Sequence, residues 1–138
     1  VKGYLQLGVE VYGGALLNPW FDRDLSIAGR LVYRNKRQQL KQTLVDFKRP
    51  VAIIPSLAIH LDRKANSDRT VNAQTDLPPL LMMTDKAESF RELLADEFLL
   101  DGEEVFGYEM CLFVSNGAAM PGSNTELLAS ARLSNLLS

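Results

Sequence analysis

The stretch LSIAGRLVYR, residues 25–34, decides the fold of this chain. Its large apolar side chains recur at alternate positions, which predicts a β-strand with one buried face and one polar face. The buried face is expected to carry Leu25, Ile27, Leu31 and Tyr33, and the polar face Ser26, Arg30 and Arg34. A sheet built on this strand needs partners on either side.

The first partner follows directly in the sequence. NKRQ at 35–38 has the composition of a polar turn, and LKQTLVDFKR at 40–49 is extended again. The return strand is expected to point Val45 and Phe47 inward and to end at Pro50, because proline cannot donate to a β-ladder. Residues 25–49 therefore predict a β-hairpin.

Three further stretches predict extended structure. YLQLGVEVY (4–12) alternates and predicts a half-buried strand, which the glycines and proline of GGALLNPW (13–20) interrupt. That interruption is read as a turn, because it lacks the glycine spacing of a phosphate-binding loop. VAIIP (51–55) is a short apolar run, and EVFGYEMCLFVS (104–115) is a long strand. The buried face of the latter is expected to carry Phe106, Tyr108, Met110, Leu112 and Val114.

One helix and one long loop complete the pattern. Asp85 and Glu88 resemble a capping box before a helix at Lys86–Leu99, in which apolar residues recur at helical spacing. Residues 60–79 are polar and have no sustained period, so they predict a long loop of the kind that often carries function. The final residues, TELLASARLSNLLS, are strand or helix. The predicted class is α+β: a β-rich domain with antiparallel strands, one clear helix and a long polar loop.

Composition excludes several classes of function. The chain has 138 residues and a net charge of −2, so no basic excess favours nucleic-acid binding. No apolar run approaches the roughly 20 residues that cross a bilayer, which argues against a membrane protein. The single cysteine, Cys111, cannot form an internal disulfide, and we expect a cytoplasmic protein with this thiol buried and inert in its strand. The chain begins at Val1 without methionine, which suggests a piece of a longer protein.

A metal site built from this chain alone is not expected. One histidine and one cysteine allow neither an HExxH nor a CxxC pattern, and DRKANSD at 62–68 lacks the glycine and the final glutamate of a calcium loop. Asp22 and Asp24 could share a metal or act as an acid–base pair. Arg23 between them favours a structural ion pair or a turn instead.

The lone histidine has two interpretations. His60 lies inside IPSLAIHLDR (54–63), between Ile59 and Leu61. It is either a structural ring, buried or half-buried with one hydrogen bond, or a catalytic or substrate-binding residue. No serine is singled out as its partner in a triad, and no nucleophile-elbow motif is present. From the residues alone the structural interpretation is the more usual one.

Three segments together resemble one known family. LGVEVYGGALLNPWFDRDLSIAGRL (7–31), DFKRPVAIIPSLAIHLDR (46–63) and LLASARLSNLLS (127–138) are similar, in the same order, to segments of the aspartyl aminopeptidase and vacuolar aminopeptidase I family. The runs YGG…WFDRDL and IPxLAIHL are the most specific parts of the resemblance, which covers essentially the whole chain, with bacterial members closest in pattern.

The resemblance implies a fragment of a dinuclear zinc aminopeptidase, a hydrolase that removes N-terminal, often acidic, residues from peptides. Residues 1–126 correspond to an inserted dimerisation domain, and 127–138 to the junction that returns to a catalytic domain. The zinc ligands are expected outside these 138 residues, so the fragment alone should be inactive. Ser134 stands where the family has an aspartate that bridges the two zinc ions, and a neutral hydroxyl is a poor replacement for that carboxylate.

The resemblance also gives His60 a role. The histidine of LAIHL in this family reaches into the active site of a neighbouring subunit, where it binds substrate or stabilises the reacting carbonyl oxygen. The polar loop at 62–79 would be the arm that lies against that neighbour. The implied partners are further copies of the chain, as a dimer within a dodecamer, and a peptide substrate, with LLNPWF (16–21) as a candidate interface anchor.

Two rival interpretations remain open at this stage. One is a stand-alone β-rich module that binds another protein and has no enzymatic parent. The other is a fragment of a catalytically dead paralogue, which the serine at position 134 would explain.

Overall fold

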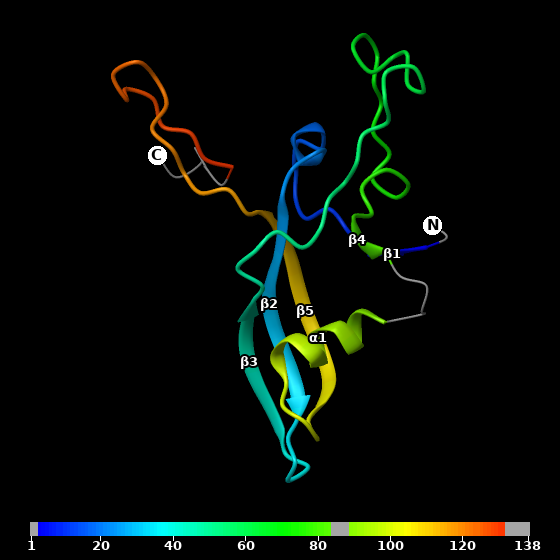
Figure 1. Cartoon of the computed structure of the whole chain (residues 1–138), viewed down its shortest axis with the longest axis vertical. Helices are drawn as coiled ribbons and strands as arrows, with labels where there is room; N and C mark the ends of the chain where they lie inside the picture. Colours follow the sequence, from blue (N-terminus) through cyan, green and yellow to red (C-terminus); the bar gives the residue numbers. More distant parts are fainter. Residues whose placement is uncertain (1–2, 84–88, 132–138) are drawn as a thin grey trace.

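The computed structural model describes residues 3–83 and 89–131, and it confirms the predicted α+β class. A three-stranded antiparallel sheet in the order β3–β2–β5 carries one helix, α1, against it, and β1 and β4 pair in a small second sheet (Figure 1). Its elements are β1 (Tyr4–Gln6), the 3-10 helix η1 (Asn18–Trp20), β2 (Leu25–Arg34), β3 (Leu40–Asp46), β4 (Leu80–Met83), α1 (Phe90–Phe98) and β5 (Glu104–Val114). The described residues include no helix long and apolar enough to cross a bilayer.

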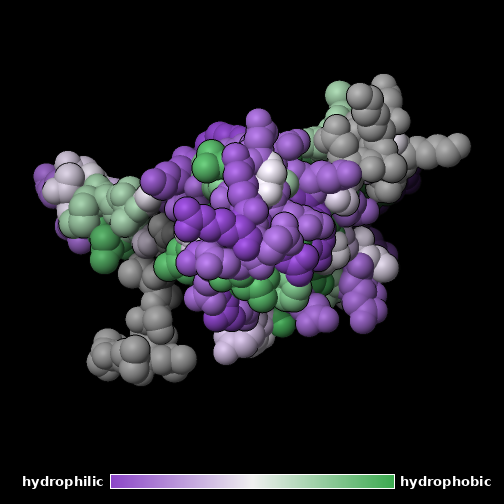
Figure 2. Space-filling model, turned by 90° about the horizontal axis from the view of Figure 1, so that it is seen from below, coloured by the Kyte–Doolittle hydropathy of each residue, from purple (hydrophilic) through white to green (hydrophobic). Residues whose placement is uncertain are grey.

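The hairpin of β2 and β3 is confirmed, but its return strand ends at Asp46 and not at Pro50 as predicted. The strands pair from Ala28 with Asp46 to Arg34 with Leu40, and the side chain of Asn35 closes the turn between them. The Asn35 Oδ1 atom accepts hydrogen bonds from the backbone amides of Arg37 and Gln39, at 2.9 and 3.0 Å. Seen from this end of the molecule, the surface is mostly hydrophilic (Figure 2). The hairpin tip is therefore a solvated end.

The inward face of β2 joins two hydrophobic clusters. Leu25 belongs to the first cluster, under the loops, and Ile27 and Leu31 belong to the second, under α1. The remaining buried members of the first cluster are Phe21, Ala52, Ile54, Leu77 and Val114, and those of the second are Phe47, Leu94 and Val105. Each fully buried leucine or isoleucine contributes about 2 kcal/mol relative to an exposed one. The predicted inward face of β2 is thus the centre of the core.

Helix α1 begins later than expected. Its capping box joins Ser89 and Glu92: the Glu92 amide donates to Ser89 Oγ at 3.2 Å, and the Ser89 amide donates to Glu92 Oε2 at 2.7 Å. The helix therefore begins at Phe90 and not at Lys86, because the cap with the correct spacing to the helical turn is Ser89. The pair proposed from sequence, Asp85 and Glu88, lies outside the described residues.

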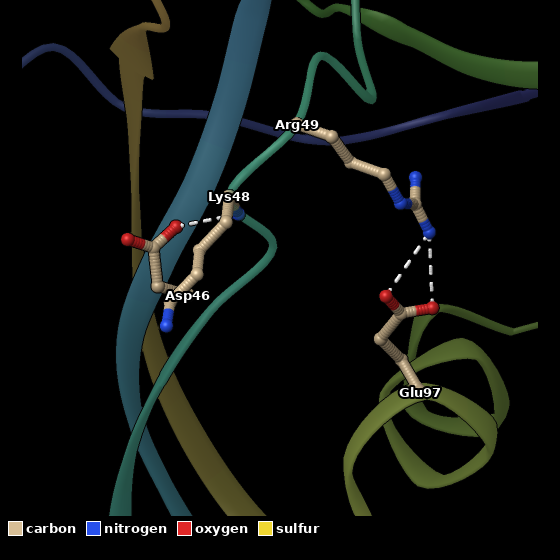
Figure 3. A network of polar contacts seen from close by, with 4 residues as sticks. All are labelled: Asp46, Lys48, Arg49 and Glu97. Carbon is tan, nitrogen blue, oxygen red and sulfur yellow. Dashed lines mark hydrogen bonds and ion pairs between the residues drawn. The ribbon is translucent and has the colours of Figure 1, made fainter.

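Polar contacts fasten the end of β3 to the helix (Figure 3). Arg49 donates from Nη2 to both carboxylate oxygens of Glu97, each at 3.0 Å. Just before it, the Lys48 amide donates to Asp46 Oδ1 at 2.8 Å, which turns the chain out of the strand. Both partners of the ion pair are partly exposed, so it contributes at most about 1 kcal/mol. The helix is held mainly by its apolar face.

Two further expectations about strand length were wrong. Residues 7–12 are not in a strand: only Tyr4–Gln6 pairs, and its partner is β4, which the sequence reading missed inside DLPPLLMM. The burial alternation nevertheless continues through Leu7 and Val9. Residues 51–55 make only isolated bridges, from Ala52 to Leu25 and from Ile53 to Leu80. Alternation of apolar and polar residues indicates which side chains face the core. A strand forms only where a neighbouring backbone pairs with that segment.

The face of β5 also differs from the prediction, because Phe106 and Tyr108, both expected to be buried, are exposed. The register with β2 shifts between Val32, which pairs with Gly107, and Tyr33, which pairs with Val105. Phe106 is the extra residue of this bulge and is 55% exposed, while Val105 is buried in its place. A bulge moves every later side chain to the other face, so alternation counted across it fails.

Two residues on the opposite face of the sheet also differ from the prediction. Cys111 pairs with Ala28 and is exposed, so the expectation of a buried thiol was wrong. Ser26, expected on the polar face, is buried, and its hydroxyl has no hydrogen-bond partner among the described residues. Gly29 lies where β5 approaches closely, because a Cβ there would overlap the carbonyl oxygen of Glu109. The outer face of the sheet is thus neither uniformly polar nor uniformly solvated.

Two leucines of the described chain test where the core lies. Leu94 is 0% exposed beneath the sheet and Leu44 is 82% exposed on β3. We expect Leu94→Ala to lower the free energy of unfolding by about 2–5 kcal/mol, because it removes buried apolar area and leaves a cavity. Leu44→Ala is the matched control and should change it by less than about 0.5 kcal/mol. Urea denaturation measures both, and equal losses would contradict the assigned core.

Candidate functional site

His60 lies on an exposed turn and not in the core. The amides of Leu61 and Asp62 both donate to the carbonyl of Ala58, at 2.8 and 3.1 Å, which curls the chain around the histidine. Its ring has no hydrogen-bond partner in the part of the chain that the structure describes. The structural interpretation, a buried or half-buried ring with one hydrogen bond, is therefore wrong for this chain.

Residues 57–68, named here the His60 loop, project from the body of the molecule beyond the sheets (Figure 1). Apolar side chains surround the histidine on this loop: Leu57 is 64% exposed, Ile59 52% and Leu61 68%. Large apolar side chains grouped on a projecting loop are typical of a surface that another protein covers. The loop thus combines one imidazole with an apolar contact surface.

The Phe21–Asp22 corner lies at the base of the His60 loop. Asp22 Oδ1 accepts a hydrogen bond from the Ser56 amide at 2.8 Å, and the Asp22 amide donates to the carbonyl of Ile54 at 2.9 Å. Hydrogen bonds from the side chain and the backbone of Ser56, together with the positive charge of Arg69, hold the pKa of Asp22 below its usual value. Asp22 therefore has a structural role, as the sequence favoured for the Asp22–Arg23–Asp24 stretch.

Arg69 joins this base from the far end of the loop. Its guanidinium lies 4.2 Å from the centroid of the Phe21 ring, and its Nη1 donates to Ser56 Oγ at 3.3 Å. No pattern in the sequence predicted this contact, since an arginine in a polar loop is usually a solvated side chain. Phe21 was also misjudged. It is buried, whereas Leu16, at the start of the candidate anchor LLNPWF, is 81% exposed.

The described residues do not form a metal site. No group of three or more histidine, cysteine, aspartate or glutamate side chains converges among them. Cys111 is exposed on β5, far along the chain from His60, and Asp22 is committed to Ser56. Ser134, which stands at the place of the family's bridging aspartate, lies outside the described residues. The donor set of the described residues, 3–83 and 89–131, therefore does not fit a zinc ion.

The family model described as aminopeptidase I zinc metalloprotease (M18) matches residues 1–138. The match defines the class of protein: this family consists of zinc metalloproteases. The chain belongs to it, the M18 aminopeptidase family. This confirms the resemblance found in the sequence.

Bacterial relatives agree with the match. The probable M18 family aminopeptidase 2 of Azotobacter vinelandii is 49% identical over 143 residues, which cover 99% of this chain and 33% of the relative. The corresponding protein of Ectopseudomonas mendocina is 50% identical over 143 residues, with the same shares of the two chains. This chain thus spans about a third of the length of the curated relatives that it matches.

Solved structures share the fold. A chain in the cryo-EM structure of the Ape4 and Nbr1 complex matches with a TM-score of 0.79 and 34% identity, over 93% of this chain and 28% of that one. Chaetomium thermophilum mApe1 matches with a TM-score of 0.73 and 30% identity, over 93% and 32%. The S. cerevisiae mApe1 dodecamer matches with a TM-score of 0.63 and 26% identity, over 91% and 28%.

The lowered pKa of Asp22 predicts a pH-dependent stability. Because the folded state favours the carboxylate, this contribution is present above the ordinary value of 3.8 and is lost as the pH falls through the lower folded value. Asp22→Asn keeps an acceptor for the Ser56 amide and tolerates the φ of 57° at this position, but it carries no charge. We expect wild type to be the more stable at neutral pH.

The difference between the two proteins should hold from neutral pH down to about 5 and should shrink as the pH falls further, toward and below the ordinary value of 3.8, because the unfolded wild-type chain then takes up a proton that folded Asp22 resists. Urea unfolding midpoints across this range measure it. A difference that stays constant over the whole range would contradict the assigned charge of Asp22.

Proposed function

We propose that this chain is the oligomerisation part of a zinc aminopeptidase and that it supplies His60 to the active site of a neighbouring subunit. The parent enzyme would remove N-terminal residues from peptides, with acidic residues as candidate substrates. Zinc, two ions in the parent, would be held outside the described residues, which do not fit it. The observation that carries the proposal is the exposure of His60 on a projecting loop with apolar neighbours.

An imidazole in this position has suitable chemistry. It can donate a hydrogen bond in either protonation state and can therefore bind a substrate carbonyl or support the negative charge that develops on its oxygen. The apolar side chains of Leu57, Ile59 and Leu61 would be buried by the neighbouring subunit and would exclude water around that hydrogen bond. The chain's own residues thus bind and orient the substrate, and the rest of the enzyme performs the hydrolysis.

Oligomerisation follows from the same geometry. A histidine that works in another subunit requires at least a dimer, and one of the solved relatives is a dodecamer. We propose a homo-oligomer of the same kind for the parent of this chain. Leu16, on the loop before η1, is a further exposed apolar contact for a neighbouring copy.

Mixed oligomers test the trans role of His60. One full-length variant carries His60→Ala, and a second carries a substitution of a zinc ligand outside residues 1–138. Each variant alone should have lost about 100-fold or more in kcat/KM, the size expected for an oxyanion donor. After the two are dissociated and reassembled together, activity should return, because the intact zinc site of one subunit receives the His60 of the other.

A histidine that acts within its own subunit would leave the mixture inactive, and this result would contradict the proposal. The same mixtures are made with Ser134 and with Ser134→Asp. Activity that appears only in the Ser134→Asp series identifies the parent as a catalytically dead paralogue and leaves the trans geometry of His60 supported.

The 138-residue chain by itself should not hydrolyse an aminoacyl reporter in the presence of zinc or cobalt. The reason is that its described residues bring together no metal ligands. The matched control is the same chain with His60→Ala, assayed under the same conditions. Hydrolysis by the wild-type chain above that control would contradict the proposal that the rest of the enzyme performs the hydrolysis.

A further inference from the structure

Among the described residues, no hydrogen bond or ion pair joins the His60 loop to the sheets or to α1. Every hydrogen bond that residues 57–68 make within the described chain closes a local turn, such as those from Ala65 to Asp62 and from Ser67 to Lys64. None of these residues belongs to either hydrophobic cluster. The position of His60 relative to the core therefore depends on the residues at the two ends of the loop.

The first end of the loop is held at Ser56. Its amide donates to Asp22 Oδ1 at 2.8 Å, and two residues earlier the carbonyl of Ile54 accepts from the Asp22 amide at 2.9 Å. Ile54 is buried in the first cluster beside Phe21. This segment is thus fastened to the Phe21–Asp22 corner by two hydrogen bonds and by apolar packing, four residues before His60.

The second end is held at Arg69, immediately after the loop. Its planar guanidinium lies over the Phe21 ring and donates to Ser56 Oγ, so that it contacts both the corner and the first end. Beyond it, Val71 and Ala73 pack against the first cluster. Arg69 is therefore the side chain that joins the two ends of the loop to each other.

We infer that Arg69, Ser56 and Asp22 are positioning residues for the aminopeptidase reaction, because they set where the His60 loop presents its imidazole. This inference rests on the proposed function of His60. A displacement of a catalytic group by about 1 Å can cost up to about 100-fold in rate, so the loss of one anchor of an otherwise unsupported loop should reduce turnover. Arginine suits the place, since it combines a planar face for Phe21 with a donor for Ser56.

A double-mutant cycle in the full-length oligomeric enzyme tests it. Arg69→Ala should lower kcat by about 10-fold, and Arg69→Lys, which keeps the charge over the ring but not the planar fork, should lower it less. In a His60→Ala background, Arg69→Ala should produce no further loss, because the group that it positions is already absent. Sedimentation checks that each variant keeps the wild-type oligomer.

The control variant is Arg37→Ala, the same substitution in the turn between β2 and β3. This hairpin tip lies at the opposite end of the sheet from the His60 loop (Figure 1). It should leave kcat unchanged in both backgrounds. Ser56→Ala is a second, milder variant that removes only the hydroxyl to which Arg69 donates. It replaces Arg69→Ala in the double-mutant cycle if Arg69→Ala does not fold.

The outcomes separate the two proposals. Full activity of His60→Ala would overturn the proposed function itself. A loss with His60→Ala, combined with an unaffected Arg69→Ala or with losses that simply multiply in the double variant, would overturn the positioning role and leave the function of His60 standing.

Discussion

The burial of one face of β2 is the constraint on which the rest of the structure depends. Leu25, Ile27 and Leu31 are essentially inaccessible to solvent, and each cluster of the core is built on at least one of them. The second cluster accepts α1 from beneath the sheet. The first accepts the corner at Phe21 and the segments that lead into and out of the His60 loop, so the same strand that organises the sheet also supports the candidate site.

The two clusters differ in the kind of structure that they hold together. Under α1 the packing is between regular elements, and polar links run from Arg49 to Glu97 and from Arg91 of the helix to the carbonyl of Val105 on β5. Under the loops the packing involves irregular segments that strand pairing does not hold. Polar contacts at Asp22 and Arg69 hold these segments in place instead. A projecting loop with exposed leucines and one imidazole is unfavourable in an isolated subunit. It becomes reasonable when a neighbouring subunit buries it.

Period-two patterns identified the central hairpin because both of its strands are local in sequence and half-buried. The same patterns failed where a neighbour decides the outcome: residues 7–12 alternate without a partner, and β4 pairs although its sequence alternates poorly. At Phe106 a bulge reversed the faces, and at Cys111 the strand proved to have one open side. Each of these depends on which backbone lies alongside, which no local window contains.

For the candidate site, the sequence alone determined the family, the scarcity of metal ligands and the residue to examine, because side-chain chemistry and motif order are properties of the chain itself. Only the tertiary structure decided that His60 is exposed, that Asp22 binds Ser56, and that Arg69 closes the loop on Phe21. These contacts join residues up to 48 positions apart (Phe21 and Arg69), and burial or exposure follows from the packing of distant segments. A pattern of residue types cannot specify such packing.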